Sequence, residues 1–80
     1  MIFLIEYDRD EGRIVSLKAF QDSEGRAAEQ TRLALELQLN LSGIEHEVVL
    51  LEAASEAALR RTHRRYFEDL QDLVSPSPAS

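Results

Sequence analysis

The feature that most constrains the fold of this sequence is a short turn between two β-forming runs. Residues 2–7 (IFLIEY) and 13–20 (RIVSLKAF) are rich in β-branched, aromatic and aliphatic side chains, and only DRDEG lies between them. Gly12 in this turn can adopt the positive φ that a hairpin loop with a bulge requires. Two strands joined by so short a loop are antiparallel, so the chain is expected to begin with a β-hairpin.

The rest of the chain predicts a helix, a third strand and a second helix. The first helix should begin near Ser23, run through a segment of strong helix formers (EGRAAEQTRLALELQLN) and end at Gly43. Residues 44–52 form the third β-rich run, and Ser55 can cap a helix that extends to about Leu73. The predicted order of elements is therefore ββαβα.

The order of elements restricts the topology of the sheet. A strand–helix–strand connection is right-handed, which leaves the third strand parallel to the second. The most apolar strand, residues 2–7, should be central, giving a three-stranded sheet of order 2-1-3. With both helices on one face, we predict an α+β fold, a two-layer α/β sandwich. Residues 1–74 should form one small domain and 75–80 (SPSPAS) a disordered C-terminal tail.

Composition and charge narrow the classes of function. Fifteen acidic against nine basic residues give a net charge of −6 and no cysteine is present, which argues against nucleic-acid and anionic-membrane partners and excludes disulfides. No window approaches the ~20 apolar residues of a membrane span, so we expect a soluble, cytoplasmic protein. A chain this short buries a thin core. Because two histidines cannot close a structural zinc site alone, self-association is the remaining way to add stability.

The alternation of residues in the strands predicts one face under the helices and one face left open. The set expected under the helices contains Phe3, Ile5, Tyr7, Val15, Leu17, Ala19, Ile44, Val48 and Leu50. The opposite face carries an apolar set that would be exposed, which is typical of an interface. That candidate interface consists of Ile2, Leu4, Ile14, Phe20, Val49 and Leu51.

The first helix is apolar on two sides, which predicts that it is buried on two sides. One stripe, assigned to the core, contains Ala28, Thr31, Leu35 and Leu39. The other side contains the further candidate interface residues Leu33, Leu37 and Leu41. Either the second helix or another subunit must cover this side. We favour a homodimer, since cyclic dimers are the commonest oligomers; the alternative is a monomer whose helices cover each other.

The segment LRRTHRRYF, residues 59–67, concentrates positive charge in an acidic chain. Placed on a helix, it turns an apolar stripe inward, formed by Leu59, His63, Tyr66, Leu70 and Leu73. The arginines fall outward and have acidic partners four residues away, in the pairs Glu56–Arg60, Arg64–Glu68 and Arg65–Asp69. A solvated helix face is the favoured interpretation. The alternative is a nucleic-acid or phosphate site on the arginine arc, with candidate polar residues Arg61, His63, Arg64, Arg65 and Tyr66.

The two histidines are the remaining chemical candidates. His63 should lie half-buried beside Tyr66, and His46 should point to the helix-covered face of the third strand, so the two could meet at a metal. A packed histidine is the favoured interpretation of each. No group beside them is evident for acid–base catalysis. We therefore predict no catalytic, cofactor-binding or metal-ligating residue, and a protein that is not an enzyme.

The stretches FLIEYDRDEGRIVSL and VVLLEAASEAALRRTHRRYF resemble short proteins of unknown function from high-GC bacteria. Those proteins similarly join an opening hairpin to a late helix with an RTHxRYF-like run. The resemblance covers nearly the whole chain and implies no activity, cofactor or partner.

Taken together, the apolar surfaces and the charge pattern predict a small homodimerising interaction module that docks a protein partner, with nucleic-acid or phosphate binding as the alternative.

Overall fold

The computed structural model describes residues 1–67. Its elements follow the order β1 (Ile2–Asp8), β2 (Arg13–Phe20), a 3-10 turn (Asp22–Glu24), α1 (Gly25–Ser42), β3 (Glu47–Glu52), α2 (Glu56–Thr62) and a second 3-10 turn (Arg64–Tyr66). The predicted α+β class and ββαβα order are confirmed. The end of the predicted domain and its tail lie outside the described residues. No helix in residues 1–67 is long and apolar enough to cross a membrane.

The three strands form one sheet of order β2-β1-β3, as predicted. β1 pairs antiparallel with both neighbours, so β2 and β3 run parallel to each other. The centre of the sheet is β1, in which all six residues from Ile2 to Tyr7 are buried. A strand that is apolar on both faces requires a covering layer on each side.

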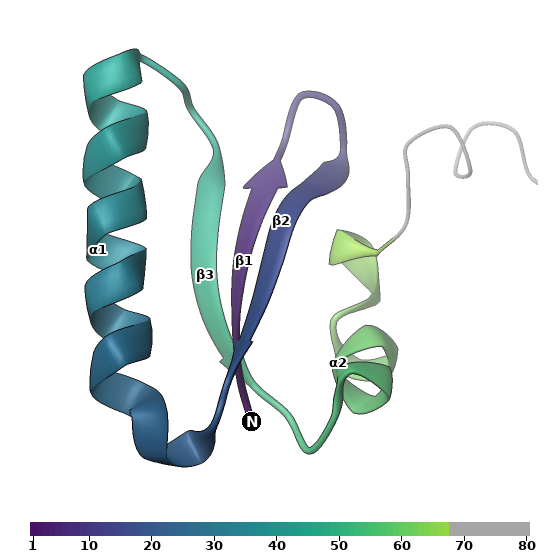
Figure 1. Ribbon diagram of the computed structural model, residues 1–80. Coiled ribbons are helices and arrows are strands. Elements are labelled where there is room, and N and C mark those ends of the chain that lie inside the picture. The colour runs from purple at the N-terminus through teal and green to yellow at the C-terminus, as the bar shows by residue number, and fades with distance from the viewer. Residues whose placement is uncertain (68–80) are drawn as a thin grey trace, which may run out of the picture.

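The two helices lie on opposite faces of the sheet, so the prediction of a two-layer sandwich with both on one face is wrong (Figure 1). α1 packs on β1 and β3, on the face that presents Ile2 and Leu4. α2 and the 3-10 turn after it pack on the other face, where Leu59 and Tyr66 join the core formed by Phe3, Ile5 and Tyr7. The physical reason is that β1 carries apolar side chains in both directions, and one helix layer can cover only one of them.

A β-bulge changes the predicted face of Ile14. Glu6 lies opposite Ser16, but Tyr7 lies opposite Ile14, so Val15 has no partner in β1 and is 49% exposed. Beyond such a bulge the alternation of side chains shifts by one residue. Ile14 therefore shares the face of Tyr7, under α2, rather than the opposite face.

The prediction that the six candidate interface residues of the sheet form one exposed face is also wrong, because they divide between the two cores. Ile2, Leu4 and Phe20 are buried in the core under α1. Val49 pairs with Ile5 and Leu51 with Phe3, which places both, with Ile14, partly buried in the core on the α2 side. Val48 and Leu50 lie on the α1 side, the reverse of the predicted assignment.

Local signals fix the ends of most elements. Gly12 has a φ of +69° and its N–H donates to the Asp8 carbonyl at 2.7 Å, closing the hairpin loop as predicted. α1 ends at Gly43, also at a φ of +69°, and the Ser55 hydroxyl accepts the Ala58 N–H to cap α2. α2 ends at Thr62, eleven residues before the predicted end, because His63 leaves the helical region (φ −122°, ψ 52°).

Candidate functional site

The side of α1 that faces away from the sheet is the most exposed apolar surface of the described chain. The predicted inward stripe is confirmed, since Ala28 is fully buried and Leu39 is 8% exposed. On the other side Leu33 is 57%, Leu37 60% and Leu41 80% exposed. Because α2 packs on the far face of the sheet, it does not cover these leucines, and the alternative in which α1 and α2 cover each other is wrong (Figure 1).

This surface also lacks charge. It consists of Gln30, Leu33, Ala34, Leu37 and Leu41, which are all exposed, and we call it the uncharged face of α1. Only the first turn of the helix, at Arg26, brings a charge to the same side. The other charges gather on one flank, where Arg32 forms ion pairs with Glu29 at 2.7 Å and Glu36 at 2.8 Å. The hydrogen bonds to these two carboxylates raise the pKa of Arg32.

The arginine-rich segment does not form the single outward arc that the sequence predicts, because its helix ends at Thr62. Arg60 pairs with Glu56 at 3.2 Å, as predicted, and its guanidinium lies 4.5 Å from the ring centre of Phe67. Arg65 belongs to the 3-10 turn and pairs with Glu47 at 2.9 Å. Arg61 and Arg64 are exposed. The predicted partners Glu68 and Asp69, and the stripe residues Leu70 and Leu73, lie outside the described residues.

Glu47 is the centre of a polar cluster on the α2 side of the sheet. Tyr66 donates its hydroxyl proton to Glu47 Oε2 at 2.5 Å, Arg65 Nη2 contacts the same oxygen, and Arg9 Nε lies 3.8 Å from Oε1. The rings of Tyr66 and Tyr7 form a T-shaped pair with 5.0 Å between their centres. Burial raises the pKa of Tyr66, and the hydrogen bond to Glu47 raises it further by a smaller amount. Sequence reasoning found Arg65 and Tyr66 but missed Glu47, which lies nineteen residues from Tyr66.

The two histidines do not meet. His63 stays on the α2 side, with its ring 6.5 Å from that of Tyr66. His46 lies across the sheet, where its Nδ1 is 2.6 Å from Oε2 of Glu6. Within residues 1–67 no group of three or more histidine or carboxylate side chains is arranged to hold a metal ion. The possibility that His46 and His63 meet at a metal ion therefore has no geometric basis in the described residues.

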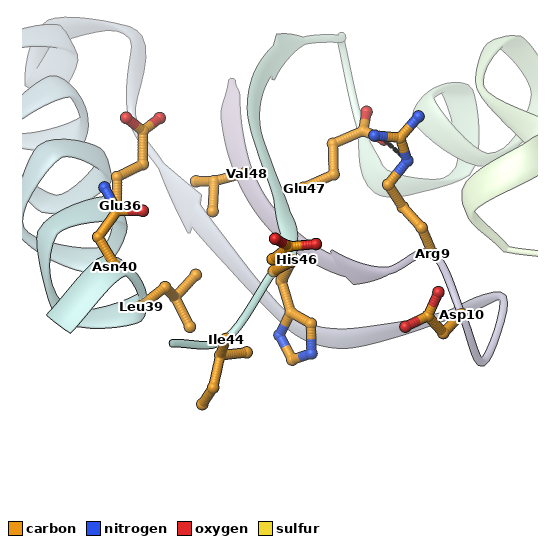
Figure 2. A pocket seen from close by; sticks show the side chains of 10 residues that line it. Arg9, Asp10, Glu36, Leu39, Asn40, Ile44, His46, Glu47 and Val48 are labelled. Atoms are coloured by element: carbon orange, nitrogen blue, oxygen red, sulfur yellow. Dashed lines mark ion pairs between the residues drawn. The ribbon is translucent and has the colours of Figure 1, made fainter. Parts of the chain in front are cut away.

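His46 lies in a groove of about 610 Å³ between α1 and the β1–β2 loop (Figure 2). Glu36, Leu39 and Asn40 form the α1 wall of this groove, and Arg9 and Asp10 form the opposite wall.

The ring nitrogens of His46 both face carboxylates. Nδ1 contacts Glu6, whose other oxygen accepts the Ser16 hydroxyl at 3.4 Å, and Nε2 lies 3.7 Å from Asp8 Oδ2. Nε2 is therefore beyond hydrogen-bond distance of Asp8, whereas Nδ1 is committed to Glu6. Glu6 was the sequence signal for this contact, because a charged residue in a buried strand requires a partner.

No family model, no curated protein and no solved structure matches this chain. The class of the protein is therefore defined by its fold and surfaces: a three-layered ββαβα domain with one uncharged, apolar helix face that no described residue covers.

Proposed function

We propose that this chain is a small, non-enzymatic interaction module that forms a homodimer through the uncharged face of α1. The observation that carries the proposal is the exposure of Leu33, Leu37 and Leu41 on the side of α1 that α2 does not reach. Contiguous apolar surface of this kind marks contact sites rather than surface left in water. The non-enzymatic part carries over the expectation that the histidines are packed side chains, in keeping with the 2.6 Å contact of His46 Nδ1 with Glu6.

The distribution of charge favours the uncharged face of α1 as the place where two copies meet. The chain has a net charge of −6 and three in ten of its residues are charged, so two copies repel each other over most of their surfaces. That repulsion is weakest where the uncharged face of one copy meets that of the other. Depletion of charge at the centre of a contact is also the compositional signature of protein interfaces.

The spacing of the leucines suggests how two copies of α1 would cross. Leu33, Leu37 and Leu41 are four residues apart and form one i±4 ridge. Two such ridges interdigitate at about −50°, the commonest class of helix packing in globular proteins. Helices that cross at this angle touch over a short length, so we expect a small interface and an equilibrium between monomer and dimer.

The test is the solution mass, measured by light scattering behind a sizing column over a concentration series. We expect the mass to rise from that of one chain, 9.1 kDa, towards twice that value. Leu37→Glu should hold the chain at the monomer mass, because the dimer would bury a carboxylate without a partner.

Gln38→Glu is the matched control. It adds the same charge at the next position, which is rotated by about 100° around the helix, and should dimerise like the parent chain. A mass of 9.1 kDa at every concentration would reject the homodimer. Equal loss of the dimer in both variants would show that net charge, not the leucine ridge, controls association.

A further inference from the structure

A second groove lies on the α2 side of the sheet, between β2 and the end of the described chain. It has a volume of about 350 Å³. Its apolar surface comes from Ile14 and Leu17 of β2 and from the rings of Tyr66 and Phe67. Ile14, Leu17 and Phe67 are only partly buried, so this side of the core is open towards solvent.

Two arginines border this groove. Arg13 in β2 contacts Glu11 at 3.7 Å, with both side chains more than half exposed. Arg60 in α2 contacts Glu56 at 3.2 Å, and its guanidinium lies over the Phe67 ring. A guanidinium has five N–H donors, and one carboxylate uses at most two of them. The groove therefore combines an apolar surface with donors suited to carboxylates.

The sequence that follows Phe67 has the complementary composition. Residues 68–74 read EDLQDLV, with three carboxylates, three aliphatic side chains and no basic residue. The next six residues, SPSPAS, carry no acid. Since Phe67 itself lines the groove, the segment EDLQDLV is attached at the edge of the surface that it complements.

We propose that residues 68–74 bind in this groove, with aliphatic side chains against Ile14 and Leu17 and carboxylates beside Arg13 and Arg60. Attachment favours this occupant over a separate protein, because a tethered segment acts at an effective concentration of about a millimolar without any partner. Binding of the segment would complete the cover of the α2 side of the sheet, as α1 does on the other side.

The test uses the absence of cysteine from the chain. Two variants of the full chain, Leu70→Cys and Ser77→Cys, each introduce a single thiol. For each variant the rate of reaction with a thiol reagent is measured in the native state and divided by the rate measured in urea. This ratio removes the effect of neighbouring charges on each thiol. We expect the thiol at position 70 to react about tenfold more slowly than the thiol at position 77, because it must leave the groove to react.

Reversal of the two arginine charges identifies the groove as the site. Arg13→Glu with Arg60→Glu should bring the rate at position 70 to within about twofold of that at position 77, since the segment would lose its partners. Arg26→Glu with Arg61→Glu makes the same change in net charge away from the groove and should leave the protection intact. Circular dichroism checks that both double variants stay folded.

Three results would overturn the proposal. Equal native rates at the two positions would show that the segment is not bound. Protection that survives reversal of Arg13 and Arg60 would place the segment elsewhere. Protection of the thiol at position 70 that disappears on dilution would show that a second copy of the chain covers it. All rates are therefore also measured in the Leu37→Glu background, which removes the proposed dimer contact.

Discussion

At the scale of single residues, Tyr66 gives the sharpest prediction of pH dependence. Burial, followed by the hydrogen bond to Glu47, raises its pKa. Tyr7 is the other of the two tyrosines, so in the Tyr7→Phe variant all tyrosine absorbance comes from Tyr66. We expect this variant to titrate above the usual tyrosine value of about 10, and the same chain in urea to titrate near it.

The sign of the linked stability follows from the direction of this shift. The folded chain holds the Tyr66 proton more tightly than the unfolded chain does, so its contribution to stability is complete below the unfolded pKa. It is lost as pH rises through the raised folded pKa. Glu47→Gln should move the midpoint back towards the usual value without removing the effect of burial. A folded midpoint equal to that in urea would contradict the prediction.

Residue types alone indicated some of these contacts and not others. The exposed leucines of α1 and the buried Tyr66 follow from helical periodicity, which depends on neighbours in sequence. The pairing of Tyr66 with Glu47 depends on how α2 docks against β3, and no local pattern encodes it. Glu6 lies between these cases: its position in an apolar strand signals a partner, but not that the partner is His46.

At the scale of elements, the glycines at the two ends of α1 should respond oppositely to substitution by alanine. Gly43 ends the helix at a φ of +69°, and a Cβ there would meet no atom within 4 Å. Gly43→Ala should therefore lower the free energy of unfolding only through the strain of the left-handed backbone, by about 1 kcal/mol. Gly25 has a φ of −56°, and a Cβ there would touch Ile2 at 3.9 Å, an ordinary contact.

Gly25→Ala should therefore stabilise the chain, by about 0.5 kcal/mol, because alanine restricts the unfolded state without strain in the folded state. Both values are read from urea denaturation followed by circular dichroism. The pair is its own control, since the two variants make the same chemical change at the two ends of α1. Destabilisation of similar size at both positions would show that side-chain volume, not backbone conformation, sets the cost.

The element boundaries show where local rules succeed and where they fail. The turns at Gly12 and Gly43 and the cap at Ser55 were predictable because each depends on one residue and its immediate neighbours. The bulge at Val15 was not, since the prediction assumed that side chains alternate without interruption over 13–20. The early end of α2 at Thr62 was missed because LRRTHRRYF has good helical periodicity, which docking on the sheet overrides.

At the scale of the whole molecule, the main error of prediction was to place both helices on one face. The order of strands was predictable from the connection rules together with the apolar content of β1, which indicates a central strand. The side that each helix takes depends on burial, and the buried run Ile2–Tyr7 shows that β1 needs cover on both faces. This correction also restricts the candidate interface to its α1 residues, since the sheet residues proposed for it belong to the two cores.

The two cores share β1, and from this we predict a single unfolding transition. Two probes report on different sides of the sheet: both tyrosines belong to the core under α2, whereas α1 supplies most of the described helix. Loss of either layer would expose one face of β1, so neither should persist alone. Tyrosine fluorescence and far-ultraviolet circular dichroism should give the same midpoint in urea.

Truncations in each core test this coupling. Leu59→Ala on the α2 side should cost about 3 kcal/mol, a large part of the roughly 4–12 kcal/mol expected for a chain of this length. It should lower the midpoint of both probes equally. Leu39→Ala, on the α1 side, is the reciprocal variant and should also move the two probes together. If Leu59→Ala shifts the tyrosine midpoint and leaves the helix signal in place, then α1 on the sheet is stable without the α2 layer, and the two faces of β1 fold independently.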